Sequence, residues 1–311
     1  MRARYVLPNY RIAVVGAGAI GSYYGAKLAY FGRDVHFLIR SGLAEVRKFG
    51  ISVRSPKENF RVAKVPAYLS TTEIGPVDLV LIALKATAND ALDELLPPLL
   101  HEKTALLTLQ NGLGNEQFLA DRFGAGRVMG GLCFICLNRV APGKIEQIDR
   151  GHLRLGEFDG FPKPRTHDVA WEFKRCGVVC SVAENLQLER WRKLVWNIPF
   201  NGLTITEGGV TTEDIVHDAR RRLLALEIMD EVIASANALG VRLPTTVALD
   251  QMKRTETMGP YQPSTLRDFE MGRPLELEAI WGEPLRRALA AGVNVPRLAE
   301  LYAQLQTLNS R

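Results

Sequence analysis

The sequence contains no long apolar run, and this shortage sets the first limits on what the protein can be. No stretch approaches the roughly 18 consecutive apolar residues that a membrane-spanning helix needs. The N-terminal segment MRARYVLPNYR also lacks the apolar region of a secretory signal. We therefore expect no membrane partner and a cytoplasmic location.

Cysteine is scarce, and its spacing gives little support to a metal site. The four cysteines are Cys133, Cys136, Cys176 and Cys180. A CxxC followed by a CxxxC invites comparison with zinc sites. Cys133 and Cys136 lie in an apolar, strand-like segment, however, and residues three apart on a strand face opposite sides of the sheet. Cys176 and Cys180 flank the apolar pair Val178 and Val179. We therefore expect buried free thiols and no metal.

The excess of positive charge is small. Lys and Arg number 39 against 34 Asp and Glu, which gives a net charge of +5. The basic residues are scattered, and their one cluster, RRR at 220–222, is typical of a solvated helix face. We expect no nucleic-acid partner, and a mild positive charge suits an enzyme with anionic ligands.

The stretch 11–40 contains a glycine pattern with a physical purpose. A short aliphatic run at 12–15 predicts a buried parallel strand, and a GxGxxG follows it at once. The first glycine allows a sharp turn, the second lets the backbone approach a pyrophosphate, and the third lets the next helix pack closely. A second strand at 35–39 completes the βαβ unit. The predicted cofactor contacts on this turn are Gly16, Ala17, Gly18, Ala19, Ile20 and Gly21.

The end of the second strand predicts which dinucleotide is bound. An NAD site usually places an acidic residue there to accept hydrogen bonds from the ribose. This sequence has Arg40 instead, and Asp34, the nearest acid, lies where the strand begins. A guanidinium binds phosphate through paired hydrogen bonds, so Arg40 suits the 2′-phosphate of NADP. The alternative is a solvated surface arginine.

Further strands and helices follow in an alternating order. We predict strands at 77–84, 104–109 and 127–137 and a helix at 88–100, while 51–54 and 60–63 form a hairpin or a loop excursion. Lys85 and Asn111 follow the first two of these strands, at the sheet edge where parallel sheets bind ligands. Taken singly, each could be an ordinary loop or capping residue.

The composition changes near residue 184, after which nearly every segment has helical periodicity. Helices are expected at 223–239 and 276–291, each followed by a glycine and a proline. We therefore predict an α/β protein with a Rossmann-type doubly wound sheet at residues 1–184 and an all-helical domain at 185–311. The amphipathic helices bury their apolar faces within one chain or in a homodimer.

One helix of the second domain has a polar face. Lys193, Asn197 and Asn201 are spaced by four residues, which places them on the same side of a helix. A lysine and two amides supply the donors and acceptors that a carboxylate or carbonyl needs. Pro199 should kink the helix and displace the third member. An ordinary solvated helix face is the alternative.

These motifs together resemble the ketopantoate reductases (2-dehydropantoate 2-reductases). The resemblance rests on GAGAIG with Arg40, ALKAT around Lys85, QNGLG around Asn111, ERWRKLVWN around Lys193, and PSTLRDFEMGRPLELEAIWG from 263 to 282. It implies NADPH-dependent reduction of ketopantoate to pantoate in pantothenate biosynthesis, part of the coenzyme A pathway. It also implies a site between a Rossmann domain and a helical domain.

The resemblance carries roles onto individual residues. Lys193 matches the proton donor, and Glu276 matches the carboxylate that binds the substrate hydroxyl. The substrate-binding positions are Asn197, Asn201 and Ser264. Positions near the cofactor are Lys85, Asn111 and, by a looser alignment, Cys136.

The sequence also departs from the family pattern. Trp281 replaces a common asparagine, Gly202 replaces a common proline, and Pro199 appears earlier than that proline. We interpret these changes as lining or adjoining the pocket, where an indole could reshape it for a different 2-oxo acid. Two alternatives therefore stay open, a reductase of another 2-oxo acid and a non-catalytic NADP-binding protein.

Overall fold

The computed structural model describes residues 10–148 and 151–309. The chain divides into two compact units. The first unit comprises the described residues up to Gln110 together with Asn115–Leu186, and the second comprises Asn111–Gly114 together with the described residues from Gln187 onward. This division groups residues by their contacts and does not define domains along the sequence. The predicted domain boundary at residue 184 therefore stays a prediction. Residues 1–9, which form most of the N-terminal segment considered in the sequence analysis, lie outside the described residues.

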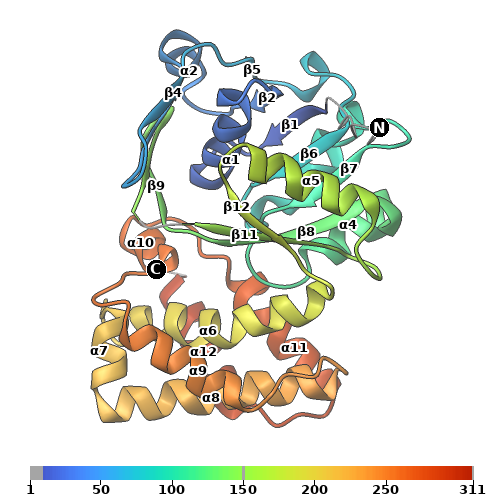
Figure 1. Ribbon diagram of the computed structural model, residues 1–311. Coiled ribbons are helices and arrows are strands. Elements are labelled where there is room, and N and C mark those ends of the chain that lie inside the picture. Colours follow the sequence, from blue (N-terminus) through green and yellow to red (C-terminus); the bar gives the residue numbers. More distant parts are fainter. Residues whose placement is uncertain (1–9, 149–150, 310–311) are drawn as a thin grey trace, which may run out of the picture. The chain divides into compact units, whose positions relative to one another are not determined.

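The first unit is built on an eight-stranded sheet (Figure 1). In spatial order its strands are β12 (Val179–Val182), β11 (His152–Glu157), β8 (Val128–Phe134), β7 (Ala105–Thr108), β6 (Leu79–Ile82), β1 (Arg11–Val15), β2 (Asp34–Leu38) and β5 (Ala67–Tyr68). From β8 to β5 all neighbours are parallel, whereas β11 is antiparallel to β8. The central strands β6 and β7 are buried along their whole length, as their aliphatic sequences predict.

Helices cover both faces of this sheet, which confirms the predicted Rossmann-type architecture. On one face α1 (Ala19–Tyr30) and α5 (Pro164–Arg175) contribute to a core that includes Val14, Phe37 and Phe173. On the other face α3 (Leu92–Leu95) and α4 (Asn115–Phe123) pack with Val15 and Ile82. The sequence prediction did not include α4 or α5. A helix α2 (Leu43–Phe49) follows β2.

A smaller, four-stranded sheet also belongs to the first unit. Its order is β4 (Phe60–Val62), β3 (Ile51–Arg54), β10 (Lys144–Gln147) and β9 (Leu137–Ala141). The hairpin β3–β4 was one of the two predicted alternatives, but the single strand at 127–137 is wrong. The chain leaves the large sheet after β8, passes through Ile135 and Cys136, and enters the small sheet as β9. The break between β8 and β9 was not predicted because the residues on both sides of it are apolar, as strands of either sheet would be.

The predicted helix at 88–100 is also wrong as a single element. The structure has a 3₁₀ helix η2 (Ala86–Ala91), the four-residue α3, and a second 3₁₀ helix η3 (Pro97–Leu99). The adjacent prolines Pro97 and Pro98 have no N–H groups to donate to the preceding turn, so an α-helix cannot continue through them. Ala88 has non-helical dihedral angles within η2, which interrupts it further.

The described part of the second unit is helical apart from its loops. Its elements are α6 (Leu186–Thr206, of which Leu186 belongs to the first unit), α7 (Thr212–His217), α8 (Ala219–Ala238), α9 (Thr246–Glu256), α10 (Ser264–Glu270), η5 (Glu278–Gly282), α11 (Glu283–Ala290) and α12 (Pro296–Asn309). They surround a core that includes Trp191, Ile198, Met229 and Trp281. No described helix is both long and apolar enough to span a membrane.

The predicted helix at 276–291 is interrupted by a π-helical turn. The turn, η5, precedes α11, and Pro284 is the second residue of α11. Proline has no N–H, so the α-helical hydrogen bond from residue 284 to the carbonyl of Ile280 cannot form. A wider turn is a known response to such a break and is frequent at functional sites.

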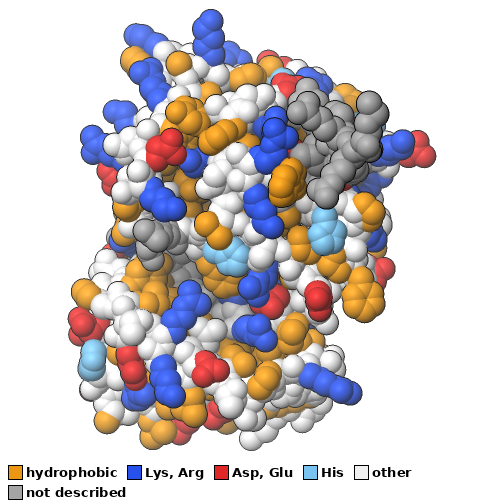
Figure 2. Space-filling view, in the orientation of Figure 1, with side chains coloured by type: hydrophobic (Ala, Val, Ile, Leu, Met, Phe, Trp, Pro, Cys, Tyr) orange, Lys and Arg blue, Asp and Glu red, His pale blue; other side chains and the backbone are white. Residues whose placement is uncertain are grey.

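The arginine cluster at 220–222 is neutralised by acidic side chains. Arg220 and Arg221 both pair with Glu207, and Arg222 pairs with Glu256 at 2.6 Å. On the face shown in Figure 2, Lys and Arg side chains are interspersed with Asp and Glu. The triplet is therefore part of an ion-paired helix surface.

Candidate functional site

The glycine turn after β1 has two positions that the protein itself requires to be glycine. Gly16 has φ +104°, and a Cβ built on it would lie 2.5 Å from the backbone nitrogen of Leu84. A Cβ on Gly21 would overlap the carbonyl oxygen of Gly16. Gly18 differs, because a Cβ there would meet no described atom within 4 Å. The space beside Gly18 is thus open, as a site for a closely approaching ligand requires.

The helix that follows this turn presents its N-terminus without a side-chain cap. Gly18 is the N-cap of α1, no side chain caps it, and the first turn contains no acidic residue. The Ser22 hydroxyl donates to the carbonyl of Ala17 at 3.0 Å, which holds the turn in place. Backbone N–H groups and the helix dipole at such an end attract a phosphate. The residues present therefore fit the pyrophosphate of a dinucleotide.

Substituting the second and third glycines should have different effects. We expect Gly18→Ala to keep the thermal stability of the protein but to weaken NADPH binding by about tenfold or more, because its methyl group enters the open space. Gly21→Ala should instead lower the melting temperature, because its methyl group meets the Gly16 carbonyl. Thermal unfolding and fluorescence titration with NADPH measure the two effects. If Gly18→Ala binds NADPH as tightly as wild type, the open space does not hold the cofactor.

Arg40 follows β2 and is exposed. It makes no hydrogen bond or ion pair with any other residue within 10–148 and 151–309. Asp34 lies at the other end of β2, where it contacts His36 at 2.9 Å and Arg11 at 3.7 Å. Asp34 is therefore bonded to other side chains at the beginning of β2, whereas Arg40 follows the end of that strand.

A chain of amides joins the carboxyl ends of β6 and β7. The Thr108 hydroxyl donates to the Gln110 carbonyl oxygen (2.8 Å), the Gln110 amide donates to Asn89 (2.7 Å), and the Asn89 amide donates to Asn115 (3.0 Å). Lys85 is the N-cap of η2, the 3₁₀ helix that contains Asn89. Sequence reasoning identified Lys85 but missed the amides. Their position after successive buried strands was the available signal.

The cysteines are free thiols. Cys176 and Cys180 are buried, and burial raises the pKa of both, that of Cys180 to about 12. They are therefore protonated and unreactive near neutral pH. Cys133 and Cys136 are only half-buried, so the expectation of burial is wrong for these two. Cys136 lies at the crossing from β8 to β9.

In the second unit, Lys193 and Asn111 are brought into contact although they are far apart in the sequence. The Lys193 ammonium donates to the Asn111 side-chain oxygen at 2.8 Å. The loop containing Asn111 is held by a bond of 2.8 Å from the Leu113 N–H to the Ala279 carbonyl. Gly112, with φ +88°, allows this approach, because a Cβ on it would overlap the Ala279 backbone. The π-helical turn thus positions Asn111.

Asn197 and Asn201 follow Lys193 on α6 at intervals of four residues and are nearly buried, each being 6% exposed. Neither side-chain amide makes a hydrogen bond to another described residue. A solvated helix face is therefore the wrong interpretation of these two residues. Buried amides are normally paired, so two unpaired ones beside a lysine indicate a place for a polar ligand.

The residues that depart from the family pattern have structural roles. Trp281 is fully buried, and its indole N–H donates to the Ile198 carbonyl at 3.0 Å. Trp281 belongs to the core and therefore does not line a pocket, whereas the interpretation that it adjoins one stays a prediction. Gly202 allows close packing, since a Cβ there would lie 2.7 Å from Leu301. The assigned helix α6 continues through Pro199.

The remaining predicted substrate residues lie elsewhere in the second unit. Glu276 is half-buried and lies two residues before the π-helical turn η5. Its backbone carbonyl accepts a hydrogen bond from the Ile280 N–H at 3.1 Å. Ser264 is exposed and is the first residue of α10. Both residues are in the same unit as Lys193.

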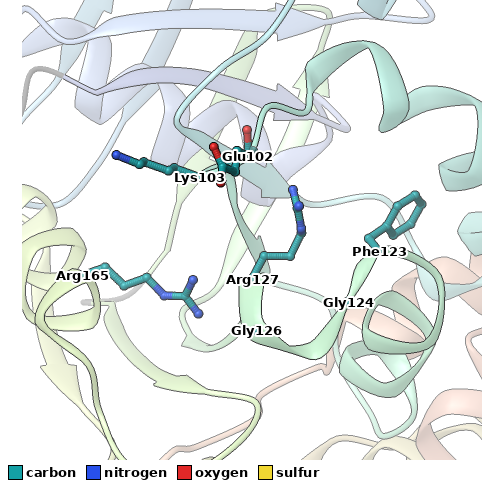
Figure 3. Close-up of a pocket in the computed structure, with 8 residues that line it drawn as sticks. Glu102, Lys103, Phe123, Gly124, Gly126, Arg127 and Arg165 are labelled. Atoms are coloured by element: carbon teal, nitrogen blue, oxygen red, sulfur yellow. The ribbon is translucent and has the colours of Figure 1, made fainter.

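In the first unit, a cavity of about 310 Å³ lies at the amino ends of β7 and β8, opposite the strand ends that Lys85 and Gln110 follow (Figure 3). It is lined in part by Lys103, Arg127 and Arg165. None of the predicted site residues lines it. Arg165 forms a two-bond ion pair with the buried Glu157, so its charge is already compensated.

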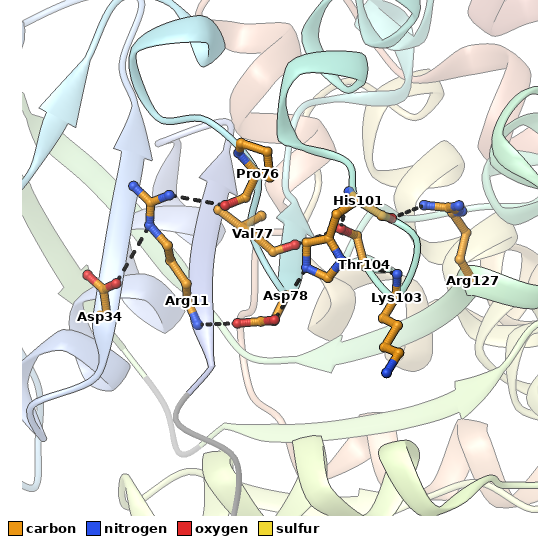
Figure 4. A network of polar contacts seen from close by, with 9 residues as sticks. All are labelled: Arg11, Asp34, Pro76, Val77, Asp78, His101, Lys103, Thr104 and Arg127. Carbon is orange, nitrogen blue, oxygen red and sulfur yellow. Dashed lines mark hydrogen bonds and ion pairs between the residues drawn. The ribbon is translucent and has the colours of Figure 1, made fainter.

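A polar network ties the strands together at the same strand ends (Figure 4). The Asp78 carboxylate accepts from the backbone N–H of Arg11 at 2.9 Å and faces His101 at 3.3 Å. The carbonyl of His101 accepts from Arg127 at 3.2 Å. The network joins the first residue of β1 to the segments that precede β6, β7 and β8, which is a structural role.

Comparison with known proteins matches almost the whole chain. The family model for ketopantoate reductase PanE/ApbA matches residues 12–160, and the model for its C-terminal part matches 185–309. A 2-dehydropantoate 2-reductase from Nostoc sp. is 39% identical over 97% of this chain and 96% of its own.

Solved structures are equally similar. The 2-dehydropantoate 2-reductase from Geobacter metallireducens has a TM-score of 0.93 and 43% identity, covering 96% of this chain and 99% of its own. That from Methylococcus capsulatus has a TM-score of 0.89 and 34% identity, covering 96% and 97%. The chain therefore belongs to the ketopantoate reductase family.

Proposed function

We propose that this protein reduces 2-dehydropantoate to pantoate with NADPH, a step of pantothenate biosynthesis. Family membership supports the reaction class. The observation that carries the chemistry is the half-buried Lys193, bonded to Asn111 and followed on α6 by two nearly buried, unpaired amides. This set of groups suits a small anion that contains a carbonyl oxygen.

Lys193 is the proposed proton donor. NADPH, when bound, supplies a hydride to the carbonyl carbon of the substrate. The carbonyl oxygen then gains negative charge as its double bond to carbon becomes a single bond. The Lys193 ammonium stabilises that charge and transfers a proton to it, which yields the hydroxyl of the product. Asn111 directs the ammonium by accepting one of its N–H bonds.

Substrate binding is assigned to the other polar groups of the second unit. Asn197 and Asn201 donate to the substrate's oxygens, which gives partners to two amides that make no side-chain hydrogen bond to another described residue. Glu276 accepts from the substrate hydroxyl, and Ser264 donates to a substrate oxygen. Because buried polar groups reject a ligand that leaves them unpaired, these residues favour a hydroxylated 2-oxo acid.

Cofactor binding is assigned to the first unit and the loop after it. The turn residues Gly16, Ala17, Gly18, Ala19, Ile20 and Gly21 bind the pyrophosphate, and Arg40 binds the 2′-phosphate. Lys85, Asn111 and Cys136 are assigned to the nicotinamide end. The free thiols suit a reducing compartment, which supports cytoplasmic action. A homodimer stays a prediction.

Steady-state kinetics with a panel of 2-oxo acids test this function. NADPH oxidation is followed by absorbance with ketopantoate, with its analogue lacking the hydroxyl group, and with unrelated 2-oxo acids. We expect ketopantoate to have the highest kcat/KM, by at least about tenfold over the analogue. A higher kcat/KM for another acid would identify a different substrate. NADPH binding without turnover of any acid would identify a non-catalytic protein.

A further inference from the structure

A second arginine reaches the loop that contains Arg40. Arg139, on β9 of the small sheet, donates through one terminal nitrogen to the carbonyl of Ser41 at 3.2 Å and to its hydroxyl at 3.5 Å. Ser41 directly follows Arg40 in the sequence. We propose that Arg139 is a second phosphate-binding arginine, which with Arg40 and Ser41 selects the 2′-phosphate of NADPH. This inference rests on the proposed function.

The small sheet attaches to this loop at two points. Besides the bonds from Arg139, Pro142 in the turn between β9 and β10 packs directly against Gly42, where an added Cβ would overlap the proline ring. The strands of the small sheet also contact α1, the helix that begins at the glycine turn. The small sheet is therefore fixed relative to both parts of the proposed dinucleotide site.

Arg40 and Arg139 are not ion-paired with any acidic side chain in the described part of the chain. The acid nearest along the small sheet, Glu146, contacts Arg54 at 3.9 Å instead. Arg40 belongs to this loop and Arg139 bonds to Ser41 of the same loop, so a doubly charged phosphate bound at the loop would be attracted by both positive charges. A phosphate would therefore bind here more strongly than to one arginine alone.

The hydrogen-bonding capacity of Arg139 is only partly used. A guanidinium has five N–H donors, and the bonds to Ser41 involve a single terminal nitrogen. The Ser41 hydroxyl accepts from Arg139 and keeps its own hydrogen as a donor. The loop and the adjoining β9 thus offer two guanidinium groups and a hydroxyl, a donor set typical of a phosphate site.

Equilibrium binding separates this role from a structural one. Isothermal titration calorimetry is performed with adenosine 2′,5′-bisphosphate and with AMP, which differ only in the 2′-phosphate. We expect Arg139→Met to weaken binding of the bisphosphate by about tenfold and to leave AMP binding within about twofold. Arg139→Lys should recover part of the loss. The matched control is Arg54→Met, which removes one positive charge from the same small sheet and should change neither affinity.

The outcomes distinguish this inference from the proposed function. If wild type does not prefer the bisphosphate to AMP, the NADP assignment fails and this inference fails with it. If wild type does prefer the bisphosphate but Arg139→Met retains that preference, only this inference is overturned. An equal loss of both nucleotides would also overturn it, because it would show that Arg139 merely supports the loop.

Discussion

Replacing Lys193 with alanine is expected to lower kcat for the 2-oxo acid by about 10³-fold or more, while the dissociation constant for NADPH stays within about twofold. In the proposed mechanism, the substitution removes both the positive charge that stabilises the developing alkoxide and the proton that completes the reduction. Each contribution is typically worth at least about 10²-fold in rate. The proposed phosphate-binding residues of the first unit are unchanged, so cofactor affinity is retained.

Two further variants make the Lys193 result specific. Lys253→Ala removes an exposed ammonium from α9 of the same unit and should leave kcat unchanged. Asn111→Ala removes the acceptor that orients Lys193, so it should lower kcat by less than Lys193→Ala does. Stopped-flow measurement of NADPH oxidation separates the chemical step from product release. If Lys193→Ala retains kcat within about tenfold of wild type, another group donates the proton.

The local parts of the candidate site could be predicted from the sequence. The GxGxxG turn and Arg40 lie within one βαβ unit, so their spacing is set by a single strand, turn and helix. The common face of Lys193, Asn197 and Asn201 follows from helical periodicity alone. In each case the residues belong to one element or to neighbouring elements, and no tertiary packing is needed to place them.

Contacts between distant segments could not be predicted. Asn111 was expected beside Lys85 at the edge of the sheet, yet it belongs to the second unit and bonds to Lys193, 82 residues away. That contact depends on the Leu113–Ala279 hydrogen bond and on the π-helical turn. Arg139 and Ser41 are separated by 98 residues and meet through the small sheet. No local pattern encodes either meeting.

Periodicity also could not locate breaks within apolar or helical segments. The sequence around the change of sheet, LCFICL at 132–137, is apolar, so nothing in its hydrophobicity marks the residue at which the chain leaves the large sheet. Prolines gave the only usable signals. Pro97 and Pro98 follow α3, and Pro284 follows the π-helical turn. At each place the missing N–H group prevents an α-helical hydrogen bond, although the apolar residues keep helical periodicity.

Trp281 shows how a departure from a family pattern can be misinterpreted. Its replacement of a common asparagine near Glu276 suggested an altered pocket. The side chain is instead 0% exposed, and its N–H satisfies the carbonyl of Ile198, the residue between Asn197 and Pro199. The indole thus braces the segment of α6 that precedes the proline. We therefore expect Trp281 to affect substrate binding only indirectly, by holding the segment of α6 that bears Asn197 and Asn201.

Trp281→Ala is therefore expected to lower the free energy of unfolding by about 3–5 kcal/mol, because it leaves a large cavity in the core of the second unit. Trp281→Phe keeps most of the volume but leaves the Ile198 carbonyl without its buried donor, so a loss of about 1–3 kcal/mol is expected. Urea unfolding followed by far-UV circular dichroism measures both values.

The control for Trp281 is Trp171→Ala. Trp171, on α5, is 53% exposed and its removal should change the free energy of unfolding by less than about 1 kcal/mol. In Trp281→Phe, the KM for the 2-oxo acid should rise while the NADPH dissociation constant is unchanged, because α6 bears the two asparagines and not the glycine turn. If Trp281→Phe instead has wild-type stability and a changed substrate preference, Trp281 lines the substrate pocket.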